Sequence, residues 1–93
     1  MLSEVCKRYN TLRNGTHTGA EAFSKAMNAE DVTDRLAYAM IALAVNAKLV
    51  EDGKFRAEDA ETIAAAMIAK VNVDDAHRNY LIGFFDLLNK TEN

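Results

Sequence analysis

The segment from Asp34 to Val50, DRLAYAMIALAVNAKLV, constrains the fold of this chain more than any other. Its apolar residues recur at helical spacings of three, four and seven, and further apolar residues widen the surface beyond one stripe. A helix that is apolar over most of its circumference has to be buried on several sides. The segment therefore predicts a central helix with other elements packed around it.

The same segment does not predict a membrane span. Its longest uncharged apolar run, Leu36 to Ala47, is about 12 residues long, whereas a membrane-spanning helix needs about 20. Residues 1–27 lack the apolar core of a secretory signal. The single cysteine, Cys6, cannot form an internal disulfide. We therefore expect a cytoplasmic protein that does not enter a membrane and is not exported by the usual route.

The composition favours helices throughout. The 93 residues include no proline and four glycines, while 49% are hydrophobic and 27% are charged. Helices are thus rarely interrupted, and Ala, Leu, Met, Lys and Glu, which favour helix, are frequent. A chain of 10.3 kDa buries enough surface for one core but not for two. We predict an all-α protein in which residues 1–93 form a single compact bundle of about five helices around the third one.

Turn and capping signals place the first three helices. Asn14 belongs to an Asn-Gly turn, so the first helix is expected to end near it. Thr18 and Glu21 have the spacing of a capping box, which predicts a second helix from about Gly19. Asn28 precedes a stretch with acids in its first turn, so the third helix is expected to start there.

Two further helices are expected in the second half of the chain. The fourth is predicted from about Ala57 to Val71. The fifth should start after Asn72, because Asp74 and Asp75 then occupy its first turn, where the helix dipole favours acids.

The connection between the third and fourth helices, LVEDGKFRAEDAE, partly resembles a calcium-binding loop. Aligning Gly53 with the obligatory glycine of such a loop puts Lys48 and Val50 at chelating positions, and Asp59 where a bidentate glutamate is needed. A lysine ammonium repels calcium, so no calcium site is expected. We interpret the stretch as a turn in which Gly53 supplies a positive φ and Phe55 folds back onto the core.

The residues that most often carry chemistry are scattered along the chain. His17 lies in a polar turn and His77 lies sixty residues later, without the spacing of a metal site. We expect His17 to cap a turn and His77 to bond to Asp74. Cys6 has no base tied to it by spacing, and we interpret it as a small core residue. With no nucleotide-binding motif present, we expect a protein that is not an enzyme and uses no cofactor or metal.

The strip CKRYNTLRNGTH near the N-terminus is a candidate nucleic-acid contact. Lys7, Arg8 and Arg13 supply cations, and Tyr9 supplies a ring that can stack on a base. The net charge of the chain is −3, however, and nonspecific DNA affinity comes mainly from neutralised phosphates. Contact with nucleic acid is therefore an alternative rather than the leading interpretation.

The segment NYLIGFFDLLN in the last helix is the candidate protein interface, because it is apolar around most of its circumference. One face, expected to fill the core, consists of Tyr80, Phe84, Leu87 and Leu88. Leu81 and Phe85 point about 100° away, at the edge of the bundle. Tyr80, Leu81, Phe84 and Phe85 are therefore the expected contact with another chain, centred on Leu81 and Phe85. The alternative is that this helix is central and that the same residues are core.

These features favour a small α-helical protein-binding module that acts as an inhibitor or adaptor by occupying a surface of a larger partner. Compact acidic helical proteins that phages and plasmids direct against host systems have this physical profile, which is an analogy of size and composition only. The alternatives are a nucleic-acid-associated protein that uses the basic strip, and a homo-oligomeric structural subunit. The sequence does not identify the partner.

Overall fold

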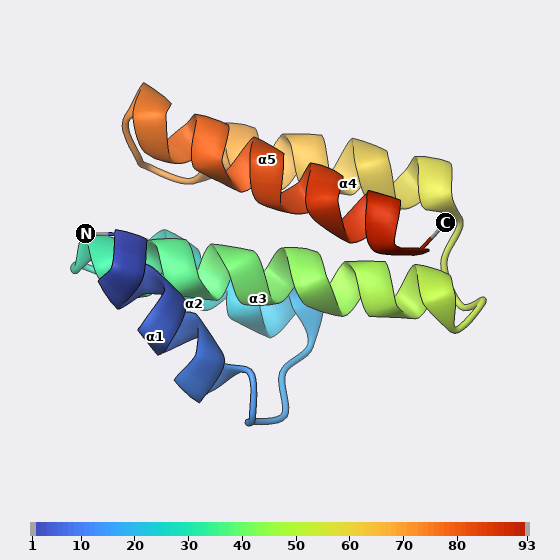
Figure 1. Cartoon of the computed structure of the whole chain (residues 1–93), viewed down its shortest axis with the longest axis horizontal. Helices are drawn as coiled ribbons and strands as arrows, with labels where there is room; N and C mark the ends of the chain where they lie inside the picture. Colours follow the sequence, from blue (N-terminus) through green and yellow to red (C-terminus); the bar gives the residue numbers. More distant parts are fainter. Residues whose placement is uncertain (1, 93) are drawn as a thin grey trace.

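The computed structural model describes the backbone of residues 2–92 and the side chains of residues 2–89, and helices dominate it (Figure 1). In chain order the helices are α1 (Leu2–Leu12), α2 (Gly19–Asn28), α3 (Val32–Glu51), α4 (Ala57–Lys70) and α5 (Asp75–Glu92). No strand occurs between residues 2 and 92. The predicted all-α class with five helices is confirmed.

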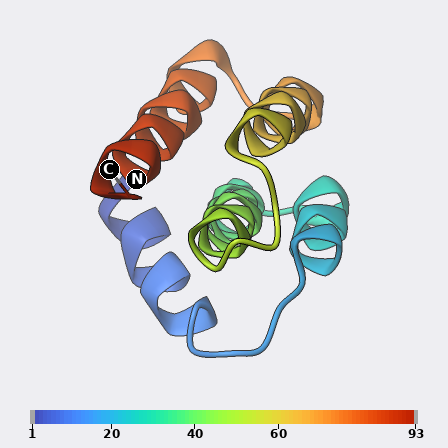
Figure 2. The ribbon, with the colours of Figure 1, turned by 90° about the vertical axis from the view of Figure 1, so that its right-hand side faces the viewer.

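Helix α3 is the axis of the bundle. Figure 2 looks nearly along it, with α1 and α5 on one side and α2 and α4 on the other. α3 packs against each of the other four helices, and α4 also packs against α5. Leu36, Met40 and Leu43 of α3 are almost completely buried. The central position predicted for the third helix is thus confirmed. Within the described chain, no helix is both long and apolar enough to cross a membrane.

The main core draws on all five helices. Val5 of α1, Ala26 of α2, Ile68 of α4 and Leu81 of α5 are buried together with side chains of α3. Each peripheral helix thus adds a few residues to a core that α3 dominates.

Cys6 is exposed, so its interpretation as a core residue is wrong. α1 turns Val5 and Tyr9, one helical turn apart, toward the core. Cys6 follows Val5 directly and therefore points about 100° away from it. Its sulfur lies 3.5 Å from the hydroxyl oxygen of Tyr80 at the surface.

The helix caps follow the sequence signals with one shift. The hydroxyl of Thr18 accepts a hydrogen bond from the backbone N–H of Glu21 at 3.1 Å and donates to the Glu21 carboxylate, which confirms the capping box. α3 starts one turn later than expected, because Asp31 caps it by accepting from the backbone N–H of Thr33 at 3.2 Å. Asn28 is instead the last residue of α2.

The connecting turns agree with the sequence. Gly53 has a φ of 75°, as the turn after α3 requires. The Nε2 atom of His17 donates to the carbonyl oxygen of Leu12 at 2.9 Å, so His17 caps the end of α1. The backbone N–H of His77 donates to Asp74 at 2.9 Å, and the ring Nδ1 lies 3.0 Å from the same carboxylate oxygen.

Arg35 ties together two connections that are distant in the sequence. Its guanidinium donates to the carbonyl oxygens of Ala29 at 3.0 and 3.2 Å, of Glu30 at 3.2 Å and of Asn72 at 2.6 Å. Ala29 and Glu30 join α2 to α3, whereas Asn72 joins α4 to α5. A planar guanidinium with five donors can serve three separate carbonyl groups at once.

Arg78 of α5 caps the end of α4 in a similar way. It donates to the carbonyl oxygens of Ile68, of Val71 at 3.3 Å and of Val73 at 3.1 Å. Two arginines thus satisfy carbonyl groups that helix ends leave without intrahelical partners.

Replacing Arg35 by lysine should destabilise the protein although the charge is kept. A lysine lacks the fork and leaves at least one half-buried carbonyl unpaired. Hydrogen bonds to charged groups contribute about 1.5–3 kcal/mol each, so we expect a loss of about 2–4 kcal/mol in the free energy of unfolding, measured by urea denaturation. Arg13→Lys is the control, because Arg13 is exposed. A loss of less than about 1 kcal/mol for Arg35→Lys would contradict this role.

Candidate functional site

Leu81 and Phe85 lie in the core of the bundle and not at its edge. Leu81 has no exposed surface and Phe85 is 9% exposed. Both belong to the buried cluster that also holds Val5 of α1 and side chains of α3, so the alternative of a core position holds for these two residues and their expected place in an interface is wrong. Neither side chain is accessible on the surface of the folded chain.

Tyr80 and Phe84 hold α1 against α5. The rings of Phe84 and Tyr9 meet edge to face with their centroids 5.5 Å apart. Burial, and then the hydrogen bond with Cys6, raise the pKa of the Tyr80 phenol to about 12. Leu87, which was expected to fill the core, is 63% exposed. The other three residues of that face, Tyr80, Phe84 and Leu88, pack against the core as expected, so Leu87 is the exception and the core also takes in Leu81 and Phe85.

The basic strip of α1 is not a uniform cationic surface. The Nε atom of Arg8 donates to Asp34 at 2.7 Å, and this bond raises the pKa of the guanidinium. The guanidinium of Arg13 lies over the ring of Tyr9, 5.6 Å from its centroid. Tyr9 itself is half-buried, so its ring is not free to stack on a base. Lys7 alone remains exposed without either kind of contact.

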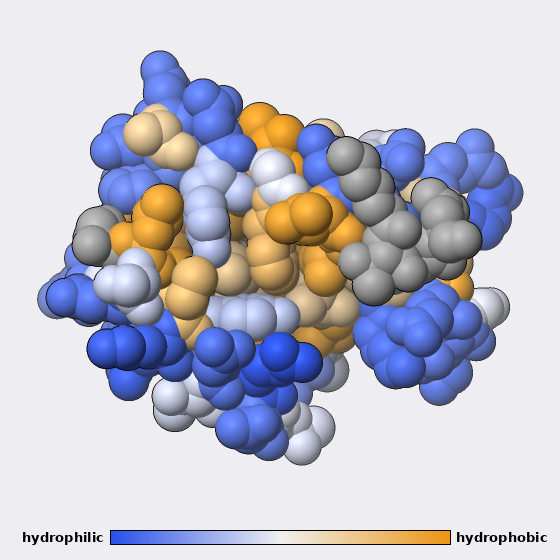
Figure 3. Space-filling view, viewed as in Figure 1, coloured by the Kyte–Doolittle hydropathy of each residue, from blue (hydrophilic) through white to orange (hydrophobic). Residues whose placement is uncertain are grey.

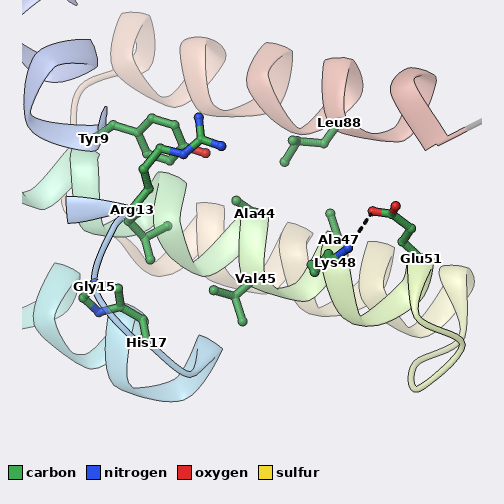
Figure 4. Close-up of a pocket in the computed structure, with 11 residues that line it drawn as sticks. Tyr9, Arg13, Gly15, His17, Ala44, Val45, Ala47, Lys48, Glu51 and Leu88 are labelled. Atoms are coloured by element: carbon green, nitrogen blue, oxygen red, sulfur yellow. Dashed lines mark ion pairs between the residues drawn. The ribbon is translucent and has the colours of Figure 1, made fainter. Parts of the chain in front are cut away.

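A groove of about 400 Å³ lies between α1, α3 and α5, on the face that Figures 1 and 3 show. Figure 3 shows apolar side chains gathered along the middle of this face, between polar margins. In Figure 4, Leu88 of α5 points toward Ala44 and Ala47 on α3. We call this site the α1–α3–α5 groove.

The charged and hydrogen-bonding side chains at the ends of this groove already have partners. The Nζ atom of Lys48 lies 3.7 Å from the carboxylate of Glu51 and 3.5 Å from that of Asp52. His17 donates to a carbonyl oxygen of α1, and Arg13 covers an aromatic ring. A ligand would have to displace these contacts to gain its own.

A second groove, of about 500 Å³, is lined by residues of α2, α3, α4 and the turn after α3. Figure 2 shows α2 and α4 on the right-hand side of α3. We call this second groove the α2–α3–α4 groove. Its lining is mostly apolar and comprises Gly19, Ala20, Phe23, Asn46, Leu49, Lys54, Phe55, Ile63, Ala66, Met67 and Lys70.

Helical spacing and small residues shape this groove. α4 presents Ile63, Ala66 and Lys70 at spacings of three and four, which places them on one face. Ile63 is 37% exposed, so its side chain is open to the groove. At the floor, Gly19 allows α2 to approach α3 closely, because a Cβ atom there would lie 2.5 Å from Oδ1 of Asn46.

Asn46 is the one polar side chain on the floor of the groove. It is 8% exposed, and its amide forms no hydrogen bond with any residue that the structure describes. The amide keeps a small opening to the groove, because no fully buried side-chain nitrogen or oxygen of the described residues lacks a partner. The amide can therefore bond to water at the groove surface. A ligand with a polar group at this point can replace that water and bond to the amide directly.

Among the described residues, Lys54 and Lys70 are the only charged ones in the lining of this groove. Both are exposed, and neither forms an ion pair with another described residue. No acid lines the groove, although the chain carries a net charge of −3. The groove is therefore an apolar site with a cationic rim on an acidic protein.

Comparison with known proteins adds no guide to this site, since no protein-family model, no curated protein and no solved structure matches the chain. Among residues with described side chains, no three of His, Cys, Asp and Glu gather where they could hold a metal. No motif in the sequence marks the α2–α3–α4 groove. The one available signal is Asn46, a polar residue inside the apolar run of α3.

Truncating Phe85 to alanine should destabilise the fold. Loss of a buried phenylalanine typically costs about 3–5 kcal/mol, and we expect a loss of that size in urea denaturation. Leu87→Ala is the matched control on the same helix and should change the free energy of unfolding by less than about 0.5 kcal/mol. A Phe85→Ala protein that kept its stability and lost an association instead would place Phe85 in an interface.

Replacing Asn46 by leucine should leave the protein equally stable or more stable. The change removes an unpaired amide and adds an apolar group of similar length, so we expect a gain of up to about 1–2 kcal/mol in thermal or urea unfolding. Asn46→Asp should instead destabilise, because it places a charge in the same buried position. Loss of more than about 1 kcal/mol in Asn46→Leu would mean that the amide supports the fold.

Proposed function

We propose that this chain is a small protein-binding module that acts as an inhibitor or adaptor by occupying a surface of a larger partner, with the α2–α3–α4 groove as its contact. One observation carries the proposal: the apolar groove combines Asn46, Lys54 and Lys70, whose polar groups have no partner among the described residues. Concave, mostly apolar sites with a few polar groups are typical of binding sites.

The larger side chains of the groove supply the free energy of such a contact. Phe23, Phe55 and Ile63 are half-buried or exposed in the free chain. Completing the burial of one such side chain contributes up to about 1.5–3 kcal/mol. A few large side chains of this kind usually provide most of the affinity of an interface. A partner segment held in the groove is no longer free to bind elsewhere, which is the basis of the proposed inhibition.

The two alternatives find less support. A nucleic-acid function would have to use α1, where Arg8 is paired with Asp34 and Tyr9 packs on Phe84. The unpaired lysines line the groove between α2, α3 and α4, and Figure 2 shows α2 and α4 on the other side of α3 from α1. A homo-oligomer would place a second copy in the groove, and solution mass separates it from a module with another partner.

The cytoplasm stays the proposed location, because Cys6 is the only cysteine and is free.

Two isoleucines provide a matched test of the contact surface. Ile63 in the groove is 37% exposed, and Ile82 on the outer face of α5 is 44% exposed. Immobilised wild-type protein, Ile63→Glu and Ile82→Glu should be compared for proteins captured from extracts of the source organism. We expect a partner that wild type and Ile82→Glu retain equally and that Ile63→Glu loses at least about tenfold, since a charge facing an apolar contact costs more than about 1.4 kcal/mol.

Both variants should keep the melting temperature of the wild type, because both positions are open to solvent. A partner lost by Ile82→Glu and kept by Ile63→Glu would move the interface to α5. Failure of both variants to alter any captured protein would refute the proposed function.

A further inference from the structure

We infer that the occupant of the α2–α3–α4 groove is an amphipathic α-helix of another protein, with acidic residues beside its apolar stripe. This inference rests on the proposed function and adds the chemistry of the partner. It is carried by the shape of the groove, by the backbone groups around it and by its charge.

The groove is open and not enclosed. Ala20, Ile63 and Ala66 in its walls are exposed to solvent. A small molecule bound there would keep much of its surface in water, whereas pockets for small ligands bury about 70–90% of them. A partner helix needs to bury only one stripe and keeps its other face in solvent. Small residues such as Ala20 and Ala66 also let another helix approach closely.

The backbone around the groove favours a helix over an extended segment. α2, α3 and α4 use their backbone groups in their own hydrogen bonds, so they offer none to an added strand. An extended segment would therefore bury unpaired N–H and C=O groups against Phe23, Phe55 and Ile63. A helix satisfies its backbone internally and brings only side chains into the groove.

The charge of the groove selects an acidic partner. Lys54 lies in the turn after α3 and Lys70 at the end of α4, and no acid of the lining competes for them. Exposed ion pairs contribute only about 0.2–1 kcal/mol each, so the acids determine selectivity and association rate more than affinity. At the floor, Asn46 can bond to one polar side chain within the apolar stripe. One buried hydrogen bond of this kind fixes the register of a helix.

A second copy of this chain fits the groove less well. Its available apolar helix face is that of α5, with Ile82 and Leu87 exposed. Insertion of α5 into the groove of another copy would be a heterologous contact, which continues into open assemblies unless the rotation closes a ring. We therefore assign the groove to a different protein.

A displayed library of helical peptides tests this assignment. Peptides of about 15 residues, long enough for four turns, carry a fixed apolar stripe at i, i+3, i+4 and i+7 and random residues beside it. They are selected on the full chain and counter-selected on Ile63→Glu. We expect Asp and Glu to be enriched several-fold beside the stripe, relative to the unselected library.

Charge reversal of the rim supplies the decisive comparison. When the peptides are selected on the double variant Lys54→Glu/Lys70→Glu, Lys and Arg should be enriched beside the apolar stripe instead of Asp and Glu. Lys7→Glu/Lys25→Glu changes the net charge equally at exposed lysines outside the groove and should still enrich acids. Selected helices without an acidic bias, or with the same bias on both double variants, would overturn the assignment of an acidic partner.

Two further outcomes would also overturn the inference. One is that no peptide binds in a way that Ile63→Glu abolishes, which rules out a helical occupant. The other is a concentration-dependent dimer, in sedimentation, that Ile63→Glu dissolves, which makes a second copy the occupant. The capture experiment with Ile63→Glu and Ile82→Glu judges the proposed function separately, because it does not depend on the occupant being an acidic helix.

Discussion

The structure depends on burying α3 on every side with helices that are shorter than it is. α3 has 20 residues, whereas α2 has 10 and α1 has 11. At 1.5 Å per residue α2 covers about 15 Å of a helix about 30 Å long. α2 runs antiparallel to α3, from Gly19 beside Asn46 to Ala29 beside Arg35. The last turn of α3 therefore projects beyond α2, and Leu49 in that turn helps to floor the α2–α3–α4 groove. The unequal helix lengths thus open the end of the groove near Leu49.

Local signals in the sequence predict the elements of this fold well. The apolar circumference of α3 gives the central helix, and side-chain caps such as Thr18 fix where helices begin. The same signals do not predict which side chains are buried where burial depends on packing against neighbouring helices. Spacing shows that α5 has two apolar faces, but the packing of α5 against α3 and α4 decides that Leu81 and Phe85 are buried while Leu87 is exposed. The interpretation of Cys6 as a core residue is wrong for the same reason, because Cys6 lies one position along α1 from the buried Val5 and points away from the core.

The candidate site is harder to predict, because it consists of residues that only the fold brings together. Lys54 and Lys70 come from a turn and from a helix end, and neither is unusual in the sequence. They contribute to the candidate site only because neither forms an ion pair with another described residue and both line the same apolar groove. Asn46 is the exception, since an amide inside an apolar helix is visible beforehand. Whether such an amide bonds within the core or faces a groove depends on the tertiary contacts of α2.

The two grooves on either side of α3 differ in how their polar groups are used. Consecutive residues divide between them, with Asn46 in one and Ala47 and Lys48 in the other. Lys48 is held by two acids, whereas the amide of Asn46 and the ammonium of Lys70 have no partner within the described chain. The α2–α3–α4 groove thus has polar groups without a partner among the described residues, whereas the α1–α3–α5 groove pairs its own, so the two sides of α3 offer different chemistry.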